Sequence, residues 1–145
     1  MVGILVTGHA NFATGLTSSV NLIAGQPQKY EAVDFIEADG VDGLAAKLSD
    51  AMDRLSDCEG ILVLSDLAGG SPFKTAVEVG MTKSNRVEVL AGTNLGMIIE
   101  ISMARGFIED VDALVDMAIN TGKDQVLRFV LPTAPQEDAF DGDGI

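Results

Sequence analysis

Short apolar runs alternate along this chain with stretches in which apolar residues recur at a spacing of three and four. The apolar runs predict β-strands over residues 2–7, 30–36, 60–65, 86–91 and 125–131. The spaced pattern predicts helices over 12–23, 41–55, 95–105 and 108–119, the last of them ended by Gly122. Strands that alternate with helices in this way form βαβ units, whose right-handed crossovers build a parallel sheet. We therefore expect a flavodoxin-like, doubly wound α/β domain with a mainly parallel sheet.

The chain changes character near residue 131. Pro132 and Pro135 interrupt regular structure, and acidic residues among glycines follow them to the end. Such a composition cannot bury an apolar core, so we expect a folded domain over 1–131 and an acidic, disordered tail over 132–145. The fifth strand, 125–131, is expected at the edge of the sheet. It can complete the sheet of its own chain or pair with a second subunit, and the sequence leaves both possibilities open.

The composition places the chain among folded globular proteins. Its 145 residues are 47% hydrophobic, which suits one domain with a sizeable core. The formal net charge of -13 leaves no basic face to neutralise phosphates, and this argues against a nucleic-acid partner. An acidic surface favours a basic protein partner, although the acidity can also serve solubility alone.

Cysteine usage and the lengths of the apolar runs bear on location. Cys58 is the only cysteine, so we expect neither a disulfide framework nor a cysteine metal site. The apolar runs are far shorter than a membrane span, and the amino-terminal segment does not resemble a signal peptide. The simplest expectation is a cytoplasmic protein.

The only histidine of the chain, His9, directly follows the first predicted strand. Open α/β sheets place ligands at the carboxyl ends of their strands, so we expect this imidazole at the mouth of the sheet. Imidazole is the side chain best suited to act as a nucleophile or base near neutral pH. A lone histidine is more often an ordinary surface or capping residue, so the interpretation depends on what the fold places beside it.

A second segment with chemical potential, Asp66 to Phe73, follows the third predicted strand. Within it Ser71 suits the N-cap of a helix and Pro72 its first residue. Gly69 and Gly70 allow backbone N–H groups to approach a ligand, and the helix N-terminus offers free donors that suit a phosphate. The alternative is a plain glycine turn before a capped helix, with an aspartate that only serves the turn.

The expected topology relates the two segments. In the strand order 2-1-3-4-5 the first and third strands are neighbours, so His9, Asp66 and the glycine loop should share one crevice. An Asp66 carboxylate that accepts the imidazole Nδ1–H leaves Nε2 free to attack, and the N–H groups of residues 69–71 can then hold a phosphoryl group. Such a site carries phosphate on histidine and needs no metal or other cofactor. Thr93 and Asn94 follow the fourth strand, where capping of the next helix is the favoured role over shaping the rim of the site.

These segments resemble the enzyme IIA component of the mannose family in the bacterial phosphoenolpyruvate-dependent sugar phosphotransferase system. The matching pieces are Thr7-Gly8-His9, Asp66 to Phe73 and Ala91 to Leu95, and with the helical pattern between them they cover residues 1–131. Within that family the chain looks most similar to members that serve N-acetylgalactosamine and related amino sugars.

The resemblance implies that His9 is phosphorylated, that Asp66 orients it, and that Ser71 lies at the phosphate beside Gly69 and Gly70. It also implies that the phosphocarrier protein HPr is the donor and a IIB protein the acceptor, with the membrane sugar permease subunits as indirect partners. It implies a homodimer in which the terminal strand can be exchanged. Some members of the family continue through an Ala/Pro-rich linker into a IIB domain. This chain instead ends in an acidic tail, so we expect the IIB protein to be a separate chain.

Other classes of protein remain to be weighed. The main alternative is a regulatory domain in which phosphorylation of His9 switches the binding of a partner. A flavin-binding protein is disfavoured because the chain has no tryptophan and only Tyr30 as a tyrosine to stack on a flavin. A response-regulator receiver is disfavoured because Gly8-His9 stands where its acidic pocket should follow the first strand.

Overall fold

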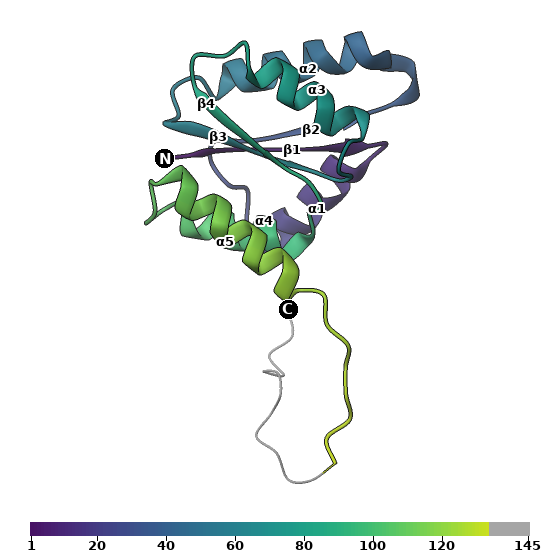
Figure 1. The fold of residues 1–145 in the computed structure, drawn as a ribbon, viewed down its shortest axis with the longest axis vertical. Helices are drawn as coiled ribbons and strands as arrows, with labels where there is room; N and C mark the ends of the chain where they lie inside the picture. Colours follow the sequence, from purple (N-terminus) through teal and green to yellow (C-terminus); the bar gives the residue numbers. More distant parts are fainter. Residues whose placement is uncertain (134–145) are drawn as a thin grey trace.

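A computed structural model describes residues 1–133, and Figure 1 shows a twisted sheet between two layers of helices. The sheet consists of β1 (Gly3–His9), β2 (Tyr30–Phe35), β3 (Gly60–Ser65) and β4 (Arg86–Leu90). These strands are all parallel and lie in the order β2-β1-β3-β4. β1 is therefore flanked by β2 and β3, and the residues that follow all three strands meet at one edge of the sheet.

Helices cover both faces of the sheet (Figure 1). One face carries α1 (Phe12–Ala24), α4 (Leu95–Ala104) and α5 (Val111–Asp124), and the other carries α2 (Gly40–Arg54) and α3 (Ser71–Gly80). Successive strand residues point to opposite faces, so that Ile4 and Val6 enter the core under α1, α4 and α5, whereas Leu5 enters the core under α2 and α3. Burial on both faces explains why β1 and β3 are continuous apolar runs.

The α/β architecture and the first four predicted strands are confirmed, and so is their order. The predicted end of the last helix at Gly122 is wrong, because α5 continues to Asp124. A Cβ atom on Gly122 would lie 2.5 Å from Met97 Sδ, so this glycine allows α5 to pack closely against α4. Because glycine has no side chain, Gly122 suggested the end of a helix. In the structure this lack of a side chain allows close packing of two helices instead.

The fifth strand predicted over 125–131 does not form in the single chain. Gln125 ends α5, and residues 126–131 then run away from the domain (Figure 1). α5 lies against a face of the sheet, so the chain leaves the domain at that face. It does not continue along the edge strand β4, where a fifth strand would have to pair. Of the two possibilities that the sequence left open, completion of the chain's own sheet is not observed. Pairing with a second subunit stays a prediction. The acidic tail predicted over 132–145 lies, from residue 134 onward, outside the described residues.

Between residues 1 and 133, no helix combines the length and the apolar character that crossing a membrane requires.

Candidate functional site

His9 is the last residue of β1 and lies at the carboxyl edge of the sheet, with 45% of its side chain exposed. The chain turns sharply after it, since Ala10 has the left-handed φ of 50° and α1 begins at Phe12. Gly8 makes this turn possible, because a Cβ atom there would lie 2.4 Å from the ring of Phe12. The strand therefore ends by presenting the imidazole to solvent.

Asp66 follows β3 and lies next to His9, as the predicted topology requires. Its Oδ2 accepts hydrogen bonds from His9 Nδ1 at 2.7 Å and from the His9 backbone N–H at 2.8 Å. Its Oδ1 accepts from the backbone N–H of Leu67 at 2.7 Å. Only 10% of the Asp66 side chain is exposed, so the carboxylate is a fixed, largely buried support for an exposed ring.

The protonation state of Asp66 determines which ring nitrogen is reactive. Partial burial raises the pKa of its carboxyl, but the hydrogen bonds from the backbone and ring of His9 and from Leu67 together outweigh it, so the pKa lies below its usual value. An ionised carboxylate only accepts hydrogen bonds, so Nδ1 of His9 carries the proton. The lone pair of the neutral ring is then on Nε2, the nitrogen that Asp66 does not engage.

Gly70 lies directly against the imidazole. A Cβ atom on Gly70 would be 3.0 Å from His9 Cε1, so the glycine provides the space that the ring occupies. Its N–H donates to the carbonyl of Leu67 at 3.1 Å and is therefore already engaged in the turn. Gly69 has the left-handed φ of 74° that favours glycine. Of the two predicted glycines, the structure thus places Gly70 directly beside His9, where it provides room for the ring.

The N-terminus of α3 begins at the next residue. The carbonyl of Gly70 accepts the first helical hydrogen bond, from Lys74 N–H at 2.9 Å, so Gly70 is the N-cap and Ser71 the first helical residue. The predicted helix start was one residue too late. The N–H groups of Ser71 and Phe73 lie in the first turn, where they have no acceptor within the helix. They make this end of α3, adjacent to the imidazole, suitable for an anion.

Phe35 is a residue of the site that the sequence reasoning missed. Its ring centroid lies 5.8 Å from that of His9 at an interplanar angle of 58°, and its carbonyl accepts the N–H of Ala10 at 2.8 Å. The sequence contained a signal for this role of Phe35. It lies at the end of the second predicted strand, and the predicted order places that strand beside the first, which ends at His9. His9 is therefore supported from β3 by Asp66 and from β2 by Phe35.

The segment after β4 has the capping role that was favoured for it. Asn94 is the N-cap of α4, with its Oδ1 accepting from Met97 N–H at 3.2 Å and its Nδ2 donating to the carbonyl of Gly122 at 3.0 Å. Thr93 is buried, and its N–H donates to the carbonyl of Ser65 at 3.1 Å. Within residues 1–133, no cluster of three or more His, Cys, Asp or Glu side chains is arranged to hold a metal ion.

Comparisons with known proteins assign the chain to a family. The chain matches the family described as PTS system fructose IIA component over residues 3–119. It is 30% identical over 125 residues to the mannose-specific EIIAB component of Escherichia coli strain K12, across 86% of this chain and 38% of that protein. The mannose/sorbose-specific IIA subunit from Enterococcus faecalis has a TM-score of 0.82 and 29% identity, over 91% of this chain and 97% of that one. The EIIA component from Streptococcus agalactiae has a TM-score of 0.78 and 32% identity, over 88% and 97% of the two chains.

The chain therefore belongs to the mannose-type EIIA family of the sugar phosphotransferase system. The predicted family is confirmed, and this membership favours a phosphoryl carrier over the regulatory alternative. The chain spans 38% of the length of the EIIAB relative that it matches. The resemblance to members that serve N-acetylgalactosamine stays a prediction.

Proposed function

We propose that His9 accepts a phosphoryl group on Nε2 from phosphorylated HPr and passes it to a IIB component during sugar uptake. The observation that carries this proposal is the asymmetry of the imidazole, whose Nδ1 is held by Asp66 at 2.7 Å while the ring remains substantially exposed. Only Nε2 is then both unprotonated and accessible to a protein partner. Family membership supplies the class of reaction.

The transfer step follows from this geometry. The lone pair of Nε2 forms a bond to phosphorus while the bond between phosphorus and the donor atom of HPr breaks, and the donor atom keeps that electron pair. The imidazole becomes positively charged, and the adjacent Asp66 carboxylate stabilises that charge through Nδ1–H. The phosphoryl oxygens are stabilised by the N-terminus of α3, at Ser71. The same steps in reverse deliver the group to IIB.

The surroundings of His9 suit protein partners. Leu67, which follows Asp66, is 62% exposed, and Ile36, which follows Phe35, is 42% exposed. Exposed apolar side chains beside a reactive group favour a docking protein over a small polar substrate. HPr and IIB would use this surface in turn, because each must reach the same Nε2 atom.

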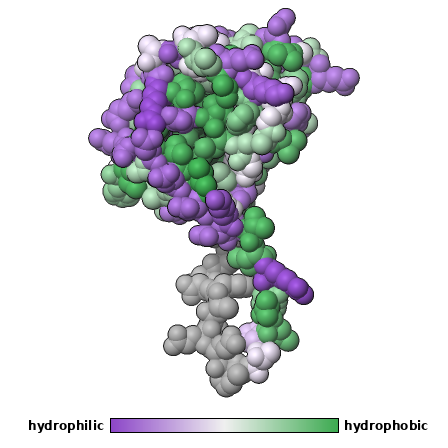
Figure 2. Space-filling view, viewed as in Figure 1, coloured by the Kyte–Doolittle hydropathy of each residue, from purple (hydrophilic) through white to green (hydrophobic). Residues whose placement is uncertain are grey.

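A homodimer is part of the proposal. Residues 126–131 include five large apolar side chains that are 63–82% exposed, and Figure 2 shows their apolar character along the segment that leaves the domain. A shallow pocket of about 260 Å³ near the end of β4 is lined mainly by apolar residues, Met97 and Val126 among them. Pairing of 125–131 with β4 of a second subunit would cover both features. We also propose a cytoplasmic location, with contact to the membrane permease subunits only through IIB.

The test is reconstitution with HPr, its kinase and labelled phosphoenolpyruvate, followed by addition of a IIB protein. A carrier becomes labelled and passes the label to IIB. A regulatory domain takes the label and keeps it, which would contradict the proposal. Failure of the wild-type chain to take any label would also contradict it.

A further inference from the structure

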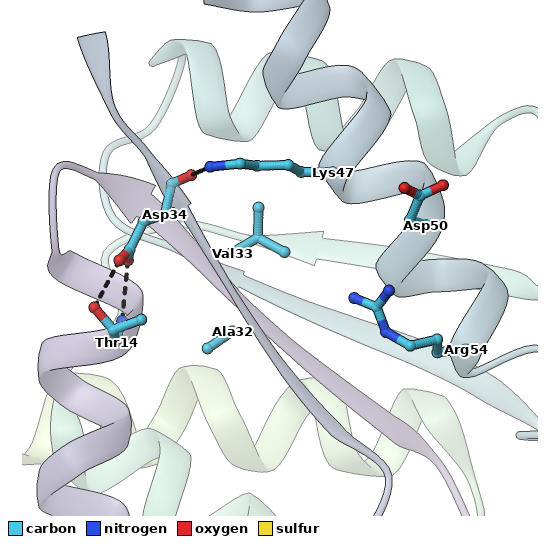
Figure 3. A pocket seen from close by; sticks show the side chains of 7 residues that line it. All are labelled: Thr14, Ala32, Val33, Asp34, Lys47, Asp50 and Arg54. Atoms are coloured by element: carbon cyan, nitrogen blue, oxygen red, sulfur yellow. Dashed lines mark hydrogen bonds between the residues drawn. The ribbon is translucent and has the colours of Figure 1, made fainter. Parts of the chain in front are cut away.

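The helix that follows His9 is capped from another strand. Asn11, the N-cap of α1, makes no capping hydrogen bond with its side chain. Instead Asp34, on β2, accepts the N–H of Thr14 with Oδ1 at 3.0 Å and the hydroxyl of Thr14 with Oδ2 at 2.6 Å (Figure 3). The first turn of a helix otherwise has unsatisfied N–H groups, so this carboxylate fixes the start of α1 to β2.

Asp34 is itself held in place. It pairs with Gly8 in the β1–β2 ladder, and its carbonyl accepts from Lys47 Nζ at 3.4 Å. Asp34 lines a pocket of about 340 Å³ between α1 and α2. Figure 3 shows Lys47 extending from α2 to the backbone of Asp34, on the side of Asp34 that faces away from Thr14. The amino group of Lys47 is fixed in turn by Asp39 at 2.6 Å. Asp34 therefore joins α1 to β2 and, through Lys47, to α2.

The turn that carries His9 lies between two fixed points. On one side, Ala10 donates its N–H to the carbonyl of Phe35 at 2.8 Å. On the other side, α1 is held by Asp34. Ala10 has a φ of 50°, which residues with a Cβ atom adopt only when their surroundings require it. The cap on α1 is one of the constraints that keep the turn in this conformation.

We propose that Asp34 is a positioning residue for His9, an inference that rests on the proposed phosphorylation of His9. By capping α1 from β2, Asp34 fixes residues 9–11 and so directs Nε2 towards the N-terminus of α3. Without the cap, α1 can shift and Ala10 can relax, and the ring then moves relative to Asp66. Reactions that depend on positioning are sensitive to displacements of about 1 Å.

The carboxylate of Asp34 has a second consequence for the site. Both α1 and α3 begin at the edge of the sheet where His9 lies, and each N-terminus carries a partial positive charge. At α1 that charge is neutralised by Asp34. Of these two N-termini, that of α3 is then the one left open to the phosphoryl group, and its N-cap Gly70 lies directly against the imidazole.

Four single variants of the full chain test the proposal. Asp34→Ala removes the cap, and Asp34→Asn keeps one oxygen acceptor for it. Thr14→Val removes only the hydroxyl donor, and Asp110→Ala is the control. Asp110 caps α5 by accepting Asp112 N–H at 3.1 Å. This cap is at the opposite edge of the sheet, where α5 begins beside Gly60. The measurements are the transfer rate at varied phospho-HPr concentration, the imidazole N–H signal of His9 in nuclear magnetic resonance spectra, and the melting temperature.

Asp34→Ala is expected to slow transfer at saturating HPr by about tenfold to a hundredfold, with KM unchanged, and to shift or broaden the Nδ1–H signal. Asp34→Asn should restore the rate to within about threefold of wild type, and Thr14→Val should slow transfer about threefold, because one hydrogen bond of two is lost. Asp110→Ala should lower the melting temperature and leave both rate and signal unchanged.

Wild-type rate and Nδ1–H signal in Asp34→Ala would overturn the proposal, and so would an Asp34→Asn variant as slow as Asp34→Ala. If Asp34→Ala does not fold, Thr14→Val decides, since a wild-type rate and signal in that variant would also overturn it. A wild-type chain that takes no label would refute the proposed function instead. The Nδ1–H signal of the variants would still show whether Asp34 positions the ring.

Discussion

One oxygen atom of Asp66, Oδ2, accepts two hydrogen bonds from His9, one from ring Nδ1 at 2.7 Å and one from the backbone N–H at 2.8 Å. The carboxylate therefore fixes the imidazole relative to its own main chain as well as to β3. This arrangement determines which nitrogen is protonated and where the other one points. The chemistry proposed for the site depends on both.

Asp66→Asn should keep the fold and slow phosphoryl transfer by about a hundredfold or more, by analogy with other His–Asp pairs. The amide cannot stabilise an imidazolium, and its NH₂ group favours the wrong tautomer of the ring. Rapid-mixing measurements of transfer in both directions test this. Asp42→Asn is the control, because it removes the same charge from an exposed position on α2. Equal rates in Asp66→Asn and wild type would show that Asp66 only serves the turn.

The lowered pKa of Asp66 predicts a specific dependence of stability on pH. Its folded-state pKa lies below the usual 3.8, so its contribution to stability is present above that value and is lost as the pH falls through the folded-state pKa. The free energy of unfolding of wild type should therefore exceed that of Asp66→Asn at about pH 7, and the difference should shrink at about pH 3. Urea titrations at both values measure it. A difference that stays constant or grows on acidification would contradict the ionised state assigned to Asp66.

Gly70→Ala should slow transfer by about tenfold, because the new Cβ atom displaces the imidazole by a few tenths of an ångström. The backbone of Gly70, with φ of −69° and ψ of 165°, is accessible to alanine, so we expect little change in melting temperature. Gly69→Ala is the matched comparison. It introduces strain at a φ of 74°, but its Cβ atom meets nothing within 4 Å. It should lower stability more and the rate less, and the reverse order would contradict the contact between Gly70 and the ring.

Phe129→Asp should convert a dimer into a monomer with its helical signal retained. Phe129 lies in the segment 125–131 and is 63% exposed in the single chain, where a partner strand would cover it. Light scattering and circular dichroism make the measurement. Met81→Asp is the control, since Met81 is 81% exposed but lies after α3 on the other face of the sheet. A wild-type protein that is monomeric at micromolar concentration would refute the predicted dimer.

The juxtaposition of His9 and Asp66 could be predicted because it follows from topology. Once alternating strands and helices imply the order in which the first and third strands are neighbours, the residues after those strands must meet. The first four strands could also be recognised from the sequence, because parallel strands that are buried on both faces consist mainly of apolar residues. Neither inference required knowledge of individual side-chain contacts.

Other features depend on contacts that periodicity does not report. The cap that Asp34 gives to Thr14 joins residues on two different elements, whereas the sequence suggested only local caps. The role of Gly122 depends on Met97, which lies on another helix. Residues 125–131 have the composition of a strand, but no strand forms there, because α5 carries the chain along a face of the sheet and not along the edge of β4.

The most direct test of the account is to identify the phosphorylated atom. His9 is the only histidine, so protein labelled with ¹⁵N at histidine gives one pair of imidazole nitrogen signals. After reaction with phospho-HPr, we predict phosphorus coupling at Nε2, retention of the proton on Nδ1, and loss of all acid-labile phosphate in a folded His9→Ala variant. Phosphorylation at Nδ1, or acid-labile phosphate that persists in His9→Ala, would contradict the assignment of Nε2 of His9 as the phosphoryl carrier.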